Sequence, residues 1–185
     1  MNIIKNIKNR VSYKKLKKPY PSSSEMELIY EAALRAPDHR YLKPSHFIEV
    51  TGKGLDKLSN LFVKYAKNDI EDLNDFKLNK IKNAPYRAPM IIILISKITE
   101  HPKVPKIEQM LSTAAATQNI LLSLDSLGYG AVWRTGSLAL NNDITKYFSL
   151  NETDEIIGYL YVGTPDQESK IIDKPNISDH VKKWN

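Results

Sequence analysis

The feature that most constrains this chain is a long apolar stretch from Ile107 to Leu124. Apolar side chains recur there at the three- and four-residue spacing of a helix, and no charged residue occurs between Met110 and Leu124. A pattern without a polar face predicts a helix that is buried around most of its circumference. The rest of the fold must therefore pack around this helix.

A glycine-framed segment follows this helix. Gly128 ends the helix at a position where a left-handed conformation costs little, and residues 131–133 predict a short strand. That strand delivers Arg134 and Thr135 to its end, just before Gly136. A guanidinium and a hydroxyl next to a flexible glycine suit an anion such as a phosphate.

The remaining pattern predicts an α+β fold in a single domain spanning residues 1–185. The most apolar run, Met90 to Ile95, is far too short for a bilayer span, which needs about 20 residues, and predicts a buried strand. Strands do not alternate regularly with helices, which argues against a parallel βαβ sheet. The other expected elements are helices near residues 3–10, 24–35, 55–65, 73–81 and 142–148, with a capping box at Ser24 and Glu27, and strands at 47–50 and 156–163.

Composition narrows the classes of function. The 185 residues include no cysteine, which excludes disulfides, zinc–thiolate sites and a cysteine nucleophile, and favours a cytoplasmic protein. The net charge of +6 is concentrated near the N-terminus, where residues 1–24 carry seven cations and no acid. Only five of the 27 cations are arginine, so an arginine points to an anion-binding site more strongly than a lysine does in this sequence.

Several common chemistries lack their motifs. The sequence has no G-x-S-x-G, H-E-x-x-H or P-loop motif, and its glycines do not form a dinucleotide-binding fingerprint. The four histidines are too scattered to predict a metal site. An anion site beside an apolar slot remains, which suits a phosphorylated cofactor whose own ring carries out the chemistry.

Six blocks of sequence, in order, resemble the FMN-dependent nitroreductase family, specifically its short NAD(P)H nitroreductase branch. They are Asn9-Arg10-Val11-Ser12, Arg35-Ala36-Pro37-Asp38-His39, residues 83–89, Lys103-Val104-Pro105 with Glu108-Gln109, Trp133-Arg134-Thr135-Gly136, and residues 157–165. The resemblance implies an intertwined homodimer with a mainly antiparallel central sheet, flanked by helices, and one FMN at each of two interface sites. It also implies ping-pong redox chemistry, in which NADH or NADPH reduces the flavin and a nitroaromatic, quinone or similar small acceptor reoxidises it.

The resemblance also assigns roles to residues. Arg10, Val11 and Ser12 match positions that hold the phosphate and ribityl chain, while Trp133, Arg134 and Thr135 match the strand-end segment that holds the cofactor on the same subunit. Arg35 and His39 match positions that reach FMN from the partner subunit. A cation near the flavin pyrimidine edge, Lys14 or alternatively Lys15, would stabilise the negative charge of the reduced ring.

The sequence departs from the family pattern in two segments. The usual Arg-Arg-Ser is Arg10-Val11-Ser12 here, and the usual Gln-Pro-Trp is Lys43-Pro44-Ser45.

Two other functions stay open: a flavoprotein of this fold that senses, modifies or stores flavin without turnover, and a basic nucleic-acid-binding module. The second has little support, because the N-terminal lysines are not interleaved with stacking aromatics. We therefore expect neither a nucleic-acid partner nor membrane binding, and no metal.

Overall fold

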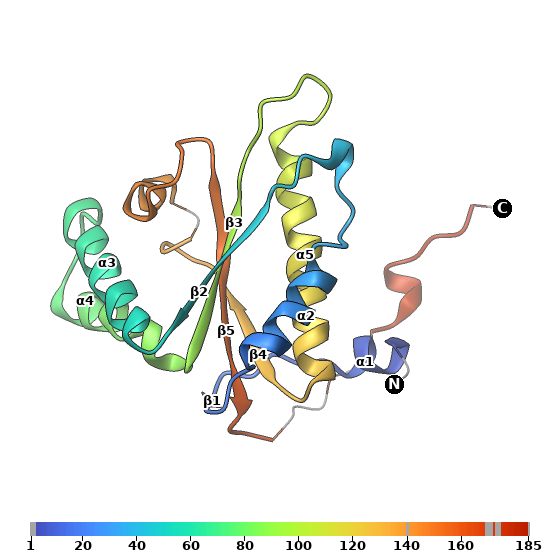
Figure 1. The fold of residues 1–185 in the computed structure, drawn as a ribbon, viewed down its shortest axis with the longest axis horizontal. Helices are drawn as coiled ribbons and strands as arrows, with labels where there is room; N and C mark the ends of the chain where they lie inside the picture. Colours follow the sequence, from blue (N-terminus) through green and yellow to red (C-terminus); the bar gives the residue numbers. More distant parts are fainter. Residues whose placement is uncertain (1–2, 140, 169–171, 173–174, 185) are drawn as a thin grey trace.

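The computed structural model describes residues 3–139, 141–168, 172 and 175–184. A five-stranded antiparallel sheet runs through its centre, with helices on both faces, as the resemblance implies (Figure 1). In chain order the elements are α1 (Ile3–Asn9), β1 (Leu16–Lys17), α2 (Ser23–Ala33), the short 3-10 helix η1 (His39–Tyr41), β2 (Ser45–Thr51), α3 (Lys53–Asp69), α4 (Asp75–Lys82), η2 (Ala84–Arg87), β3 (Met90–Ser96), α5 (Lys106–Ser126), β4 (Gly130–Arg134), η3 (Asn142–Phe148), β5 (Glu155–Pro165) and η4 (Ile177–Asp179).

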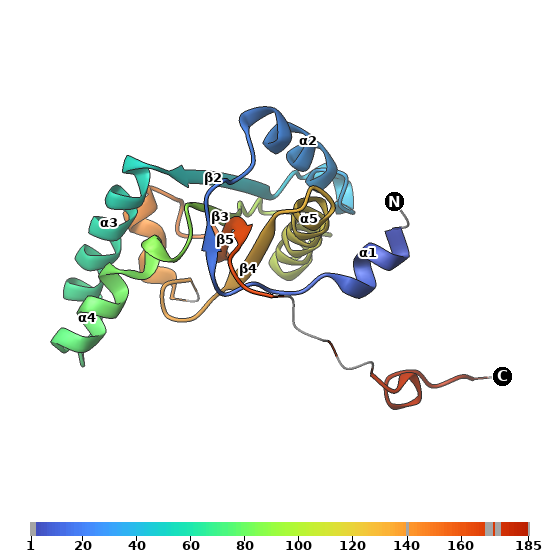
Figure 2. The same ribbon diagram turned by 90° about the horizontal axis from the view of Figure 1, so that it is seen from below.

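The sheet is organised around β5, which pairs with β1, β3 and β4, while β2 pairs with β3. Each residue of β3 is buried, because helices cover both of its faces. One face packs against α2 and α5 through Met90, Ile92 and Leu94, and the other packs against α3 and η3 through alternating residues Ile91, Ile93 and Ile95. Figures 1 and 2 show α3 and α4 on one side of the sheet and α2 and α5 on the other. None of the helices in the described residues is both long and apolar enough to cross a membrane.

Three local expectations differ from the structure. The capping box of α2 is formed by Ser22 and Glu25, two residues before the predicted pair. Residues 142–148 form a 3-10 helix, and Asn141 caps it by accepting a hydrogen bond from the Asp143 amide at 2.9 Å. The two-residue strand β1 was not predicted, since so short a pairing leaves no periodic signal.

The long helix α5 is less enclosed than its composition predicts. Leu111 is 60% exposed and Ile107 is 57% exposed, so one side of the helix near its start carries apolar side chains that the described residues leave largely uncovered. Exposed isoleucines also lie along α1, which contacts α5: Ile3, Ile4 and Ile7. The prediction that most of the circumference of this helix is buried is therefore wrong near its start, where Ile107 and Leu111 are exposed.

Candidate functional site

The strand end predicted to bind an anion carries an arginine with one unpaired hydrogen-bond donor. The guanidinium carbon of Arg134 lies 5.2 Å from the centre of the Tyr161 ring, on the face of the sheet towards α3. Its Nε is buried and has no hydrogen-bond acceptor among the described residues. A buried donor without an acceptor costs about 1–3 kcal/mol, so a ligand oxygen that reached it would relieve that cost. Thr135, the next residue, is exposed.

Trp133 occupies the opposite face of β4. Its indole Nε1 donates to the Ile157 carbonyl at 3.1 Å, and the ring packs with the core between the sheet and α5. This packing depends on Gly158, where an added Cβ would lie 2.1 Å from Trp133 Nε1. The indole thus fixes β4 against β5, and its predicted contact with a cofactor stays a prediction.

The segment that carries Arg10, Val11 and Ser12 runs from α1 to the start of β4. The amide of Tyr13 donates to the Ala131 carbonyl at 3.1 Å, which holds this segment beside the strand. Ser12, Lys14 and Lys15 are exposed, and Val11 is half-buried. Three positions that bear a hydroxyl or a cation are therefore accessible to a ligand along β4.

Arg10 lies near the carboxyl end of α5. Burial raises the pKa of the Asp125 carboxyl, and the positive charge of Arg10 acts in the opposite direction. Arg134 instead lies over Tyr161, on the other face of the sheet from α5. The structure thus places the two predicted phosphate-binding arginines beside different elements.

His39 lies at the other end of α5, and Arg35 is exposed just after the end of α2. His39 Nδ1 donates to Glu108 Oε2 at 2.7 Å, and Glu108 is in the first turn of α5. The neighbouring Asp38 does not contact the ring; its carboxylate accepts from the amides of Leu42 (3.2 Å) and Lys43 (2.7 Å). Glu108 is therefore the residue that orients His39, and only its place in a family-like block marked it in the sequence.

The two groups of predicted site residues are far apart in one subunit. Glu108, beside His39, and Asp125, beside Arg10, are separated by 17 positions of one helix, which at 1.5 Å per residue is about 25 Å. This distance exceeds the length of an FMN molecule. Within a single chain, the two groups therefore lie at opposite ends of α5.

Two buried tyrosines anchor the loop that follows Thr135. Tyr65 donates to the Ser137 carbonyl at 3.3 Å and Tyr159 donates to the Leu138 carbonyl at 2.5 Å. Their side chains are only 1% and 2% exposed, and burial raises the pKa of both phenols, so each remains a donor at neutral pH. Sequence reasoning missed both, because they lie on α3 and β5, far from the loop in the chain.

We expect Tyr159→Phe to lower the free energy of unfolding by about 0.5–1.5 kcal/mol, the net value of a typical hydrogen bond, while the ring packing is kept. A shift in the urea midpoint would measure this. Tyr86→Phe is the matched control, because Tyr86 donates to Asp56 at the surface, where the loss should be smaller. Equal shifts in both variants would contradict an anchoring role for Tyr159.

A cavity of about 670 Å³ opens beside the anchored loop. Arg87 from η2 contributes to its wall, as do Thr135 and Gly136 at the end of β4. The other lining residues are Tyr65, Asp69, Ile70, Glu71, Asp72, Lys77, Lys80, Ile81, Ala84, Ser137, Leu138 and Asn141. No cluster of potential metal ligands occurs in the described part of the chain.

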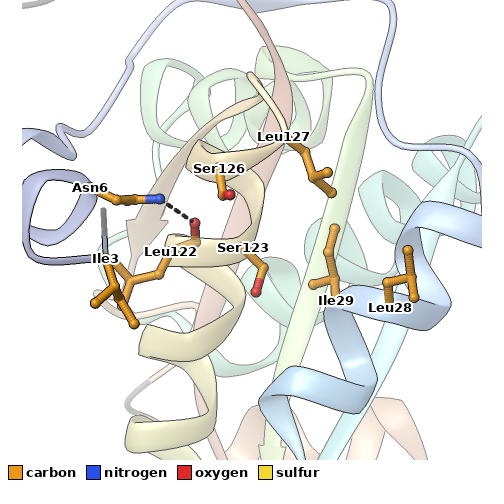
Figure 3. Close-up of a pocket in the computed structure, with 8 residues that line it drawn as sticks. All are labelled: Ile3, Asn6, Leu28, Ile29, Leu122, Ser123, Ser126 and Leu127. Atoms are coloured by element: carbon orange, nitrogen blue, oxygen red, sulfur yellow. Dashed lines mark hydrogen bonds between the residues drawn. The ribbon is translucent and has the colours of Figure 1, made fainter. Parts of the chain in front are cut away.

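A second, smaller hollow of about 390 Å³ lies between α1, α2 and α5 (Figure 3). Its wall is mainly aliphatic, from Ile3, Leu28, Leu122 and Leu127, and Asn6 Nδ2 donates to the Leu122 carbonyl at 3.4 Å. This hollow continues the exposed apolar surface of α1 and α5. It therefore belongs to the same uncovered side of the subunit.

Comparisons with known proteins agree with the sequence blocks and the fold. The model of the Nitroreductase family matches residues 7–164. A Haemophilus influenzae protein named "Putative NAD(P)H nitroreductase" is 37% identical over 178 residues, covering 94% of this chain and 96% of its own. Among solved structures, a nitroreductase-like family protein from Bacillus cereus matches with a TM-score of 0.87 at 20% identity, over 100% of this chain and 96% of that one. A Bacteroides fragilis nitroreductase with bound FMN matches with a TM-score of 0.71 at 19% identity, over the full length of both chains.

The family match covers the whole of α5 and of β4, and the segment of Arg10 and Ser12 that runs beside β4. The relative from Haemophilus influenzae is similar over nearly its entire length, so the likeness is not confined to a shared core. This chain belongs to the nitroreductase family.

Proposed function

We propose that this protein is an FMN-dependent NAD(P)H oxidoreductase that transfers electrons to a nitroaromatic, a quinone or a similar electron-poor acceptor by a ping-pong cycle. The observation that carries the proposal is the end of β4, where a chain of the nitroreductase family presents a buried Arg134 donor without an acceptor beside an exposed Thr135. Bound FMN would supply a two-electron carrier that takes hydride from NADH or NADPH. The name of the Haemophilus influenzae relative and the FMN in the Bacteroides fragilis structure support the choice of cofactors.

The donors available along β4 fit such a cofactor. Arg10 and Ser12 offer a guanidinium and an exposed hydroxyl for phosphate and ribityl oxygens, and Val11 between them is half-buried. At the other end of the strand, Arg134 and Thr135 would hold the cofactor on the same subunit as Trp133. Lys14 or Lys15, both exposed, would place a positive charge where the reduced ring becomes negative.

We infer that the functional unit is a homodimer in which residues 1–185 of each chain form one FMN-binding domain. A two-fold axis that packs α5 against the partner's α5 in antiparallel orientation would bring the partner subunit's His39 end next to Arg10, which resolves the separation of about 25 Å. The exposed apolar side chains on α1 and α5 suit such an interface. Exposed apolar residues on the C-terminal segment, which extends outward past α5 in Figures 1 and 2, would add to it: Ile177, Val181 and Trp184.

The first test is the visible spectrum of the protein purified without added cofactor, followed by acid release and identification of any chromophore. We expect FMN at about one per subunit, and NAD(P)H oxidation that depends on added quinone or nitroaromatic. Bound FMN without turnover on any acceptor would favour a flavin-sensing or flavin-modifying member of the fold. A protein that binds no FMN would contradict the proposal altogether.

Arg134→Ala should weaken FMN retention, because it removes a charged donor whose loss costs about 1.5–3 kcal/mol, or about tenfold or more in the dissociation constant. Fluorescence titration of the apoprotein with FMN measures the change. Lys57→Ala serves as the control, since it removes an exposed cation on α3 that is not part of the site. If the two variants bind FMN equally well, Arg134 does not hold the cofactor.

A further inference from the structure

One cation in the large cavity has no role in the proposed cofactor site. Arg87, in η2, lines the 670 Å³ cavity, is exposed, and makes no ion pair or hydrogen bond within the described ranges. Its positive charge reaches Tyr161, the ring that the Arg134 guanidinium covers. Two arginines therefore act on one tyrosine, and the one of them that lines the cavity, Arg87, brings a positive charge to its wall.

One acidic residue of the cavity, Asp69, is engaged by neighbouring side chains. Asp69 accepts from Lys146 Nζ at 2.7 Å and from the Tyr147 hydroxyl at 2.5 Å. Glu71 and Asp72 come from the same α3–α4 connection, and Lys77 and Lys80 of α4 line the wall with them. Lys77 Nζ donates to the Asp72 backbone carbonyl at 2.8 Å, and Arg87 is the one guanidinium among the described residues that line the cavity.

Part of the cavity wall is apolar. Ile70, Ile81, Ala84 and Leu138 line it, and Tyr65 adds an aromatic ring. A pocket with apolar walls and one free guanidinium suits a flat ring that bears a carboxylate. The cavity begins at Thr135 and Gly136, the strand end assigned above to the cofactor, so a ring bound in it would lie next to the flavin.

We propose that this cavity binds the electron acceptor and that Arg87 selects acceptors that are aromatic carboxylates over neutral aromatics of the same shape. The inference rests on the proposed function, because it places the acceptor beside bound FMN. Arg87 acts in it as a specificity-determining residue. It holds the carboxylate of the acceptor and takes no part in electron transfer.

The test compares 4-nitrobenzoate with 4-nitrobenzamide, which has the same ring and nearly the same size but no charge. In Arg87→Gln we expect kcat/KM for 4-nitrobenzoate to fall about tenfold or more, the value of a charge-assisted hydrogen bond, and that for 4-nitrobenzamide to stay within about twofold. Arg87→Lys should recover part of the loss. Lys82→Gln is the matched control, because it removes an exposed cation of α4 that does not line the cavity.

Calorimetric titration with benzoate, which cannot be reduced, separates this inference from the proposed function. We expect benzoate to bind the FMN-loaded wild type and Lys82→Gln alike, and Arg87→Gln at least about tenfold more weakly. If wild type reduces 4-nitrobenzamide but Arg87→Gln leaves both the selectivity and benzoate binding unchanged, the selectivity proposal fails and the function stands. If neither nitro compound is reduced while benzoate binding still depends on Arg87, the anion site stands and the reductase proposal fails.

Discussion

Gly158→Ala is expected to destabilise the subunit by several kcal/mol. The added Cβ would lie 2.1 Å from Trp133 Nε1 and 2.9 Å from the Arg134 carbonyl, so the indole must leave its position or β4 must move away from β5. Overpacking of this kind costs about 1–3 kcal/mol. Gly158 also has a φ of +147°, and an unfavourable backbone conformation adds about 1–3 kcal/mol.

Gly128→Ala separates these two contributions. Gly128 has a φ of +85°, and a Cβ added there meets nothing within 4 Å, so its replacement costs only the backbone strain of about 1–2 kcal/mol. Urea denaturation of both variants should give a clearly larger loss for Gly158→Ala. The emission of Trp133 should also shift to the red as its ring loses its place in the core. A Gly158→Ala variant as stable as Gly128→Ala would mean that the indole is not fixed against the glycine.

The fold was predictable where burial leaves a strong periodic or continuous apolar signal. The run that starts at Met90 is buried on both faces of the sheet, so its composition alone predicted the strand β3. The capping box was predicted two residues late, because both Ser22 with Glu25 and Ser24 with Glu27 have the required spacing. Only the backbone geometry at Ser22 decides between them.

The exposure of α5 was not predictable for a different reason. An apolar side chain has the same sequence signature whether it enters the core of its own chain or an interface with another chain. Ile107 and Leu111 were thus counted with Leu121 and Leu124, although only the latter two are buried in the subunit. The exposed pair is consistent with the homodimer proposed above.

The candidate site shows a similar division between local and distant signals. The sequence singled out Arg134 and Thr135 because a glycine, a strand and an anion-binding residue type occur within nine positions. Glu108, Tyr159 and Arg87 come from remote parts of the chain. No local spacing in the sequence connects them to His39, to the loop after Thr135 or to the cavity wall, where the structure places them. Their contributions depend on sheet order and helix packing, which only the three-dimensional structure provides.

Leu111→Asp is expected to convert the proposed homodimer into monomers and to release FMN. Leu111 is 60% exposed in the single subunit, so the subunit itself should tolerate a carboxylate there. In a two-fold interface through α5, however, the substitution buries two unpaired carboxylates, at a cost of about 3 kcal/mol or more each. This loss corresponds to a dimer dissociation constant raised about ten-thousandfold.

In this variant, the mass measured by sedimentation equilibrium should fall to that of a monomer, and the absorbance of bound flavin should be lost with it. Its circular dichroism spectrum should stay that of the wild type. Phe76→Asp provides the control, because Phe76 is 78% exposed on α4, on the other side of the sheet from α5. That variant should remain dimeric and keep its FMN. If Leu111→Asp remains dimeric with flavin bound, the interface does not run through α5, and the partner's His39 would not reach the cofactor held by Arg10.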